Sequence, residues 1–354
     1  MIEKFFRQDI RNFKPYEVGE GTFNIKLDAN ESFIEFPLDL KEQIASAVIN
    51  VPFNRYPDPD SKALCKLYSE FIKVDEKNII AGNGSDELVQ IIVTTFLDKG
   101  DKLFVVSPDF SMYQVYAEIR GGKVVSLDLD KKFKLDVNLL IDKVAMEKPK
   151  ILILSNPNNP TGGIIPEEDI IKVIENCNCI VIIDEAYVEF YGKSVVNRIK
   201  DYDNLIVLRT CSKALGSAGL RLGFLITNEI LLKEIKKVKP PFNVNSISQA
   251  IGVVILKNRI FIEESISRII EEKSYLYEEL NKIEDIKTYP TEANFILIET
   301  YNADKINRKL IEKGIKVRKF NEGRLENCLR INAGSREENE AVLGVLKETQ
   351  KVNR

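Results

Sequence analysis

The strongest constraint on the fold is an alternation of two residue patterns between about residue 62 and residue 230. Short apolar, β-branched runs such as KLFVVS, ILILS, IVIID and LIVLRT are typical of strands that are covered on both faces. Between them lie amphipathic stretches such as SDELVQIIVTTFL, which have the spacing of helices that cover a sheet. The sequence therefore predicts an α/β fold with a large, doubly wound, mostly parallel sheet.

The chain has 354 residues, which is long enough for more than one domain. The Pro240-Pro241 pair interrupts the helical stretch NEILLKEIKKV and marks the best boundary. From Ile286 onward the pattern changes to strand, helix, strand and strand, and Ser335 is placed to cap a final helix together with Glu338. We predict an amino-terminal arm with part of the small domain at residues 1–51, a large domain at 52–240, and a linking helix with a small α+β domain at 241–354.

The composition excludes several classes of function. The chain contains no histidine, so Ser/His/Asp and Cys/His catalytic groups and metal sites built on imidazole are ruled out, and no metal is expected. The 51 Lys and Arg residues nearly balance the 54 Asp and Glu residues, which gives a net charge of −3. Both signs are interspersed along the chain, which argues against a nucleic-acid partner.

Cysteine usage and apolar runs bear on the compartment. The five cysteines are scattered without a CxxC pair, which fits a reducing environment. No apolar run approaches 18 residues, and the amino-terminal sequence carries charges where a signal peptide needs an apolar stretch. We therefore expect a cytoplasmic protein with no membrane partner.

Two ionisable residues follow two of the predicted buried strands. Asp184 ends the strand CIVIID, and Lys213 comes shortly after the strand NLIVLRT. Ligands of doubly wound sheets bind outside the carboxyl ends of the strands, so both side chains are expected at one sheet edge. Taken singly, the aspartate could equally serve as a helix cap or an ion-pair partner, and a lone lysine is usually solvated. Together they suit a pyridoxal phosphate site, in which an amine forms a Schiff base and a carboxylate keeps the pyridine nitrogen protonated.

The same edge offers a place for an anionic group. In AGNGSDEL the glycines, including Gly84, allow a tight turn, and a helix that opens at Ser85 directs free backbone N–H groups at an anion. A plain strand-to-helix loop is the alternative, because such turns are common. Arg221 follows Lys213 by eight residues and can reach the same anion. The segment SNPNNPTGG fixes an irregular path that presents Asn159 to the sheet edge.

These motifs resemble those of a known enzyme family. SNPNNPTGG, IDEAY and RTCSKALGSAGLRLGF, in this order and spacing, look like the fold-type-I pyridoxal-phosphate aminotransferases, and more narrowly the histidinol-phosphate aminotransferases. KPYE, LDANES, RYPDPD, AGNGSDE and LRINAGSREEN have counterparts in that family at similar positions, so the resemblance covers nearly the whole chain. It implies pyridoxal 5′-phosphate as the cofactor.

The resemblance also implies a role for individual residues. Lys213 corresponds to the Schiff-base lysine that moves the α-proton, and Asp184 to the partner of the pyridine nitrogen. Tyr113 corresponds to the aromatic residue that stacks on the pyridine ring. Desolvation and the nearby Arg221 are expected to lower the pKa of Lys213. The other cofactor residues are Asn159 and Tyr187 at the 3′-oxygen, where they tune basicity, and Gly84, Ser85, Asp86, Thr210, Ser212 and Arg221 at the phosphate.

Further residues are implied at the dimer interface and around the substrate. Tyr56 in RYPDPD corresponds to a tyrosine that reaches the phosphate of the neighbouring subunit, which implies a homodimer with shared active sites. Arg330 corresponds to the arginine that binds the anionic end of the substrate. Tyr16, Asn30 and Arg318 are further candidates around the same pocket.

The implied activity is transamination of L-histidinol phosphate with 2-oxoglutarate, which gives imidazole-acetol phosphate and L-glutamate in histidine biosynthesis. One alternative keeps the fold and cofactor but changes the chemistry, as in an aromatic or broad-range aminotransferase or a threonine-phosphate decarboxylase. A pyridoxal-phosphate-binding transcription regulator needs a DNA-binding domain, and only about 50 residues precede the large domain here. A catalytically inactive relative is disfavoured because Lys213 and Asp184 are both present.

Overall fold

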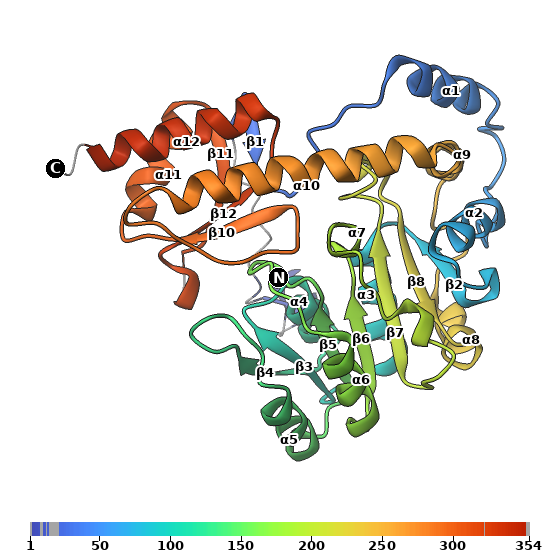
Figure 1. Cartoon of the computed structure of the whole chain (residues 1–354). Coiled ribbons are helices and arrows are strands. Elements are labelled where there is room, and N and C mark those ends of the chain that lie inside the picture. The colour runs from blue at the N-terminus through green and yellow to red at the C-terminus, as the bar shows by residue number, and fades with distance from the viewer. Residues whose placement is uncertain (1, 8–9, 12, 14–20, 322, 352–354) are drawn as a thin grey trace.

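The computed structural model of the chain describes residues 2–7, 10–11, 13, 21–321 and 323–351. Its helices and strands form a large α/β unit and a smaller α+β unit (Figure 1). No helix among these residues is both long enough and apolar enough to cross a membrane.

The large unit is built on a seven-stranded sheet with the order β2-β8-β7-β6-β5-β3-β4. Strand β8 runs antiparallel to both of its neighbours, and the other paired strands are parallel. The prediction of a mostly parallel sheet is therefore confirmed. The strands are β2 (Ile79–Gly82), β3 (Lys102–Ser107), β4 (Lys123–Asp128), β5 (Ile151–Ser155), β6 (Ile180–Asp184), β7 (Leu205–Thr210) and β8 (Gly223–Thr227).

Helices cover both faces of this sheet, which explains why its central strands are apolar at every position. On β5, Ile151 and Ile153 pack in one core with helices α3, α4 and α8, whereas Leu152 and Leu154 pack in the other with α2, α5 and α6. A strand buried on both sides has no face left for polar residues. The helices of this unit are α2 (Lys62–Ile72), α3 (Ser85–Phe96), α4 (Met112–Ile119), α5 (Val137–Glu147), α6 (Glu167–Asn176), α7 (Val188–Tyr191) and α8 (Glu229–Val238).

The small unit has a five-stranded sheet with the order β1-β11-β12-β10-β9. Its first strand comes from the amino-terminal part of the chain and pairs in parallel with β11. The helices α11 and α12 pack on this sheet around a third apolar core. The elements are β1 (Ile25–Leu27), β9 (Lys287–Thr288), β10 (Phe295–Glu299), β11 (Ile315–Lys319), β12 (Cys328–Asn332), α11 (Ala303–Glu312) and α12 (Arg336–Lys351).

A long helix, α10 (Arg259–Asn281), runs from the large unit to the small one (Figure 1). It follows α9 (Ser246–Lys257), against which α1 (Leu38–Ile49) packs. The prediction of a long helix after the Pro240-Pro241 pair is confirmed, and α8 ends just before that pair. Short 3₁₀ segments lie at Ile2–Phe5, Glu76–Asn78, Val196–Arg198, Ala218–Leu220 and Gly323–Leu325.

Local sequence signals set several helix ends. Helix α6 begins directly after Pro166, whose fixed φ suits a helix start. Helix α12 begins with a capping box, because Ser335 Oγ accepts from the Glu338 N–H at 3.3 Å while the Glu338 carboxylate accepts from the Ser335 N–H at 2.8 Å. The predicted cap of Ser335 and Glu338 is therefore confirmed. Helix α3 begins at Ser85, as predicted, but no side chain caps it.

Candidate active site

The carboxyl ends of β5, β6 and β7 lie side by side and carry the polar residues of the site. Ser155 at the end of β5 is the register partner of Asp184 at the end of β6. The Asp184 carboxylate is buried, and burial raises its pKa to about 6. Its Oδ2 accepts a 2.7 Å hydrogen bond from the Tyr113 hydroxyl, and its Oδ1 accepts from the Ala186 N–H at 3.0 Å. This carboxylate is fixed in place and suited to a cationic partner in the site.

Lys213 follows β7 and projects toward the amino-terminal segment that crosses the site. Its Nζ donates a 2.7 Å hydrogen bond to the backbone carbonyl of Ala29. Desolvation lowers the pKa of Lys213 to about 8, and the largest charge effect in the same direction comes from Arg330, with a smaller one from Arg221. The predicted direction is confirmed, although Arg330 rather than Arg221 is the main cationic influence. A lysine of this kind can act as a nucleophile and a base near neutral pH.

The first turn of α3 forms an anion cradle. Gly84 has a φ of +86°, and a side chain there would meet the Arg221 guanidinium at 2.8 Å. A side chain at Gly223 would meet the Ser85 nitrogen at 2.6 Å. The two glycines therefore let β8 and Arg221 approach the turn closely. Because no side-chain hydrogen bond caps this helix among the described residues, its first N–H groups and the positive end of its dipole are available to an anion such as a phosphate.

Four polar side chains lie around this cradle. Arg221 Nη1 donates to Ser212 Oγ at 3.3 Å, and its Nη2 lies 3.5 Å from an Asp86 carboxylate oxygen. The Thr210 hydroxyl accepts from the Ser212 N–H at 3.1 Å and donates to the Leu222 carbonyl at 3.4 Å. Thr210 thus holds the Ser212 backbone in place, while Arg221 and Ser212 face the cradle.

The loop after β5 meets the small unit across the site. Arg330 on β12 is buried, and its guanidinium donates to Asn159 Oδ1 and, at 2.6 Å, to the Asp28 carbonyl. Because the oxygen of the Asn159 amide accepts from Arg330, the NH₂ group of this amide remains as a donor. The structure brings Asn159 and Arg330, which are 171 residues apart in sequence, into direct contact.

Asn30 and Tyr187 form a further hydrogen-bonded pair near Arg330. Asn30 Nδ2 donates to the Tyr187 hydroxyl at 2.8 Å, and the Asn30 backbone N–H donates to Asn332 Oδ1 at 3.2 Å. Asn30 has a left-handed backbone with a φ of +55°. Its Oδ1 is buried without a hydrogen-bond partner among the described residues. An unsatisfied buried acceptor is costly, so this oxygen is available to a donor on a ligand.

Arg318 lies beside Arg330, because the two residues are directly paired on antiparallel strands β11 and β12. Paired residues of neighbouring strands project from the same face of a sheet, so the two guanidinium groups share one side of the small sheet. Tyr16, the other candidate predicted around this pocket, lies outside the described residues.

The burial of Tyr113 argues against the prediction that it stacks on a cofactor ring. Tyr113 is 1% exposed, so it has no free ring face, and its hydroxyl is bound to Asp184. The ring of Phe110 packs edge-on against it, with centroids 5.4 Å apart. Phe110 is only partly buried and is the aromatic residue of this segment with surface left for a ligand. The sequence DFSMY contains both aromatic residues, Phe110 and Tyr113, and only the geometry at the start of α4 shows which ring is buried.

Sequence reasoning also missed Asp109, which precedes Phe110. Asp109 accepts a hydrogen bond from the Ser155 hydroxyl at the end of β5 and another from the Phe110 N–H at 2.8 Å. Burial raises the pKa of Asp109 to about 7. The available signal in the sequence was a carboxyl group four residues before Tyr113, in the same segment.

Tyr56 differs from the buried residues of this cluster because it is largely exposed. Its side chain is 82% exposed, and its ring stacks on Phe242 with centroids 4.6 Å apart. It makes no hydrogen bond to the other predicted site residues among those that the structure describes. An exposed aromatic of this kind is suited to contact with another molecule.

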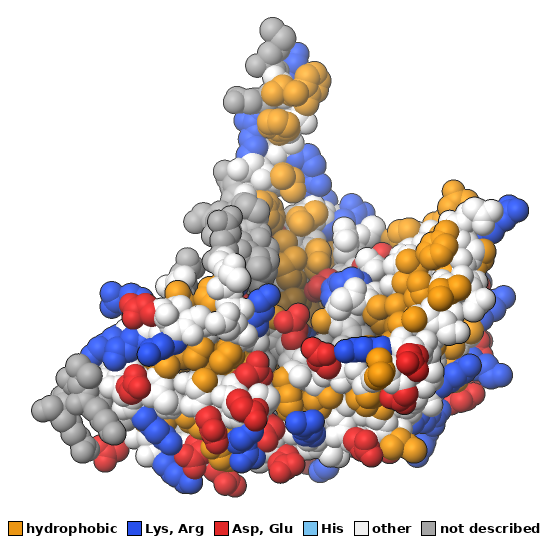
Figure 2. All heavy atoms as spheres, turned by 90° about the horizontal axis from the view of Figure 1, so that it is seen from above, with side chains coloured by type: hydrophobic (Ala, Val, Ile, Leu, Met, Phe, Trp, Pro, Cys, Tyr) orange, Lys and Arg blue, Asp and Glu red, His pale blue; other side chains and the backbone are white. Residues whose placement is uncertain are grey.

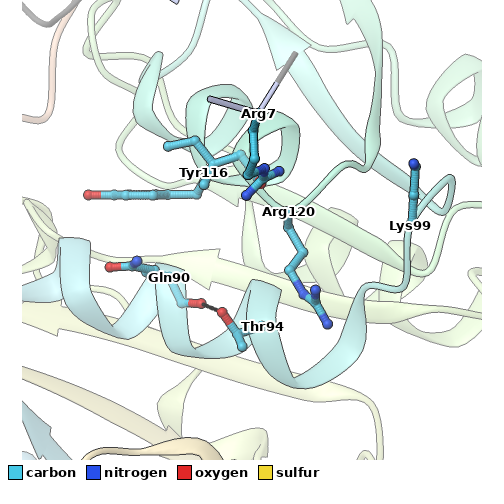
Figure 3. A pocket seen from close by; sticks show the side chains of 7 residues that line it. Arg7, Gln90, Thr94, Lys99, Tyr116 and Arg120 are labelled. Atoms are coloured by element: carbon cyan, nitrogen blue, oxygen red, sulfur yellow. Dashed lines mark hydrogen bonds between the residues drawn. The ribbon is translucent and has the colours of Figure 1, made fainter. Parts of the chain in front are cut away.

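A separate hollow lies between α3 and α4. It has a volume of about 330 Å³, and Figure 3 shows Tyr116 and Gln90 on one side of it and the guanidinium groups of Arg7 and Arg120 on the other. Arg7 donates a 2.8 Å hydrogen bond to the carbonyl of Ile119 at the end of α4. Because none of the predicted site residues lines this hollow, it is not part of the candidate active site.

Comparison with known proteins identifies the family. Residues 24–346 match the family described as aminotransferase class I and II. The chain is 58% identical to the histidinol-phosphate aminotransferase of Clostridium novyi (strain NT) over 347 residues, which is 98% of each protein.

Solved structures show the same fold. The histidinol-phosphate aminotransferase of Sinorhizobium meliloti, solved in complex with pyridoxal-5′-phosphate, superimposes with a TM-score of 0.89 at 21% identity and covers 99% of this chain and 98% of that one. The histidinol-phosphate aminotransferase of Clostridium acetobutylicum gives a TM-score of 0.85 at 28% identity, over 93% of this chain and 99% of that one. The fold is therefore fold type I. The chain belongs to the class I and II aminotransferases and, within them, to the histidinol-phosphate aminotransferases.

Proposed function

We propose that the chain is a pyridoxal-phosphate-dependent enzyme that transfers the amino group of L-histidinol phosphate to 2-oxoglutarate, giving imidazole-acetol phosphate and L-glutamate in histidine biosynthesis. The observation that carries the proposal is the convergence at one sheet edge of Lys213, with its lowered pKa, the buried Asp184 carboxylate and the uncapped first turn of α3. The names of the close relatives support this substrate.

The residues of the site fit the proposed cofactor. The cradle of Gly84, Ser85, Ser212 and Arg221 is suited to the phosphate of the cofactor. Asp184 is suited to its pyridine nitrogen, since a carboxylate that accepts two hydrogen bonds is stabilised in its ionised form and favours a cation beside it. When bound, the cofactor supplies an electron-withdrawing ring that takes up the electrons of the breaking bond at the substrate Cα.

Lys213 is the proposed proton carrier. With a pKa of about 8, about a tenth of its amine is neutral at pH 7, and the neutral form is the one that can attack a carbonyl or accept a proton. Its Nζ would accept the proton from the substrate Cα and carry it to the cofactor. The Asn159 amide and the Tyr187 hydroxyl are the proposed donors to the cofactor's ring oxygen. The Asn159 oxygen already accepts from Arg330 and the Tyr187 oxygen from Asn30, which leaves the protons of both groups for another acceptor.

Arg330 and Arg318 are the proposed anion binders for both substrates. A guanidinium can form two parallel hydrogen bonds with a phosphate or with a carboxylate. The same pair can therefore hold the phosphate of histidinol phosphate in one half-reaction and a carboxylate of glutamate in the other. The unsatisfied Asn30 oxygen is an acceptor for a hydrogen-bond donor of the substrate.

We further propose that the protein is a cytoplasmic homodimer in which Tyr56 reaches the phosphate cradle of the neighbouring subunit. Support comes from large exposed hydrophobic side chains around α1, namely Leu38, Ile49, Phe53 and Tyr56, which are 69–82% exposed. Figure 2 shows hydrophobic side chains gathered on the side of the molecule where α1 and α9 lie in Figure 1. Apolar surface of this extent is typical of an interface.

The experiment that tests the proposed activity is a spectral titration. The purified protein is loaded with pyridoxal phosphate and titrated with L-histidinol phosphate, and a fresh sample is titrated with an aromatic amino acid. We expect histidinol phosphate to bleach the visible band of the lysine-bound cofactor at low concentration and the aromatic amino acid to do so weakly. Equal responses would move the substrate to an aromatic or broad-range aminotransferase, and carbon dioxide release from threonine phosphate would indicate a decarboxylase.

A further inference from the structure

Asp109 lies at the carboxyl end of the sheet, two residues after β3 ends, and is not used by the proposed reaction. It receives three hydrogen bonds: from the Ser155 hydroxyl, from the Phe110 N–H at 2.8 Å and from the Ser155 N–H at 3.5 Å. All three donors belong to strand ends or loops that border the site. A carboxylate is an acceptor with several lone pairs, so it can hold these donors together.

The hydrogen bonds of Ser155 determine where its single proton points. Its Oγ accepts from Asn158 Nδ2 at 3.2 Å and from the Asn159 backbone N–H at 3.4 Å. A hydroxyl has one proton to donate, and here that proton is directed to Asp109. The Asp109 carboxyl therefore fixes the orientation of the hydroxyl that holds the start of the SNPNNPTGG loop.

The same loop carries Asn159 to its place in the site. Its backbone is tied to Ser155, and its side-chain oxygen accepts from the Arg330 guanidinium. A continuous series of hydrogen bonds thus joins Asp109, Ser155, Asn159 and Arg330. Loss of Asp109 removes the acceptor that orients the Ser155 hydroxyl, and this weakens the hold of that hydroxyl on Asn158 and Asn159.

We propose that Asp109 is a positioning residue for the transamination: through the Ser155 hydroxyl it holds Asn159 where its amide can donate to the cofactor's ring oxygen while it remains bound to Arg330. The inference rests on the proposed function, because it needs the cofactor in the site. Asp109 itself touches neither substrate nor the reacting atoms in this arrangement.

A direct electrostatic role predicts a different result from a positioning role. The ionisable groups that face Asp109 are Asp184 at the end of β6 and Tyr113 on α4. If Asp109 acted only by its negative charge, removing it would disfavour protons nearby and lower the pH midpoint of the visible band of the lysine-bound cofactor. Losing the Asn159 hydrogen bond to the ring oxygen has the opposite effect and raises that midpoint. A hydrogen bond to the ionised oxygen favours the deprotonated form of the lysine-bound cofactor, so its loss favours the protonated form.

The test is a set of pH titrations of the visible band in the full-length, cofactor-loaded protein. The variants are Asp109→Ala, Ser155→Ala, Asn159→Ala and the double variant Asp109→Ala with Asn159→Ala. We expect each single change to raise the midpoint by about one pH unit, on the scale of one hydrogen bond to a charged group. We expect the double variant to shift no further than Asn159→Ala alone, because the residues act in series.

Two further variants serve as controls. Asp128→Ala removes an exposed aspartate from the end of the neighbouring strand β4 and should leave the midpoint unchanged. Asp109→Asn keeps the size of the side chain and an acceptor oxygen, so it should raise the midpoint less than Asp109→Ala. If Asp109→Ala fails to fold, the Ser155→Ala shift decides the question, since that residue is the proposed intermediary.

Several outcomes would overturn the inference. They are a lowered or unchanged midpoint in Asp109→Ala, an unchanged midpoint in Ser155→Ala, or a double variant whose shift equals the sum of the two single shifts. These results in the variants overturn the inference when the wild-type protein shows a normal cofactor band. A wild-type protein without any cofactor band would instead contradict the proposed function itself.

Discussion

The hydroxyl of Tyr113 donates a 2.7 Å hydrogen bond to Oδ2 of Asp184, and both side chains are buried. This bond lowers the pKa of Asp184 against the larger opposing effect of burial, which leaves that pKa at about 6. Tyr113 thereby helps to keep Asp184 ionised at neutral pH, the state that a protonated ring nitrogen requires.

Substitution of Tyr113 by Phe tests this relationship. The change removes one hydrogen bond to a charged group, worth about 1.5 kcal/mol or more, so we expect about tenfold weaker cofactor binding at pH 7. The pKa of Asp184 rises further, and the loss therefore grows as the pH falls toward 6. Tyr202→Phe is the matched control, because Tyr202 also donates to a carboxylate, that of Glu175, but away from the site. Equal affinities of wild type and Tyr113→Phe would show that Asp184 does not depend on this bond.

Substitution of Lys213 by Ala removes the proposed nucleophile and proton carrier. We expect the band of the lysine-bound cofactor to disappear and the rate to fall by about 10³-fold or more, while the thermal midpoint of the loaded protein stays near that of wild type. Absorption spectra and initial rates measure both effects. Retention of full activity would rule out the mechanism.

The lowered pKa of Lys213 predicts that this residue decreases the stability of the cofactor-free protein in a pH-dependent way. The folded-state pKa is about 8, below the usual 10.5, so the folded state disfavours the protonated amine. The cost is present in full below about pH 8 and declines as the pH rises toward 10.5, where the unfolded chain also loses the proton. We therefore expect Lys213→Met to raise the melting temperature of the cofactor-free protein at pH 7, with a gain that shrinks by pH 10. A gain independent of pH would show that packing, not charge, causes it.

Substitution of Arg330 by Ala tests whether one group binds both substrates. Loss of a charge-assisted hydrogen bond typically costs about 1.5–3 kcal/mol, so we expect KM to rise about tenfold to a hundredfold for histidinol phosphate and for 2-oxoglutarate alike. Arg308→Ala, on the exposed side of α11, is the control. A rise for only one substrate would mean that the two anions are held by different groups.

Tyr56 allows a direct test of shared active sites. Tyr56→Phe should weaken cofactor binding about threefold to tenfold, as expected for one lost hydrogen bond, whereas Tyr301→Phe, at another highly exposed tyrosine, should not. Mixed dimers give a sharper result: one subunit carries Tyr56→Ala and the other Lys213→Ala. If the sites are shared, such a dimer contains one site with both residues intact and recovers activity. No recovery after mixing would place each Tyr56 outside the partner's site.

Much of the fold was predictable because buried parallel strands and their covering helices leave strong local patterns. The apolar runs that end at Ser155, Asp184 and Thr210 follow from burial on both faces, and the rule that ligands gather at strand carboxyl ends then brought Asp184 and Lys213 together. The helix start at Ser85 and the capping box of Ser335 and Glu338 are also local signals. Each depends on residues within a few positions of one another.

Contacts between distant segments were not readable in the same way. Tyr113 and Phe110 both fit an aromatic position, and only the packing of α4 on the sheet buries one ring and leaves the other partly accessible. The parallel pairing of β1 with β11 joins segments almost 300 residues apart. No local periodicity specifies which strand a short run such as β1 will pair with.

The sequence by itself determined the class of chemistry, because the absence of histidine, the strand-end Asp184 and Lys213, and the glycine turn before α3 follow from composition and local geometry. Only the tertiary structure decided how those residues act. Desolvation and the proximity of Arg330 set the pKa of Lys213, and the contact between Arg330 and Asn159 orients the Asn159 amide. Both effects arise from groups that the chain brings together across the two sheets, and such distances are set by the packing of whole elements rather than by the order of neighbouring residues.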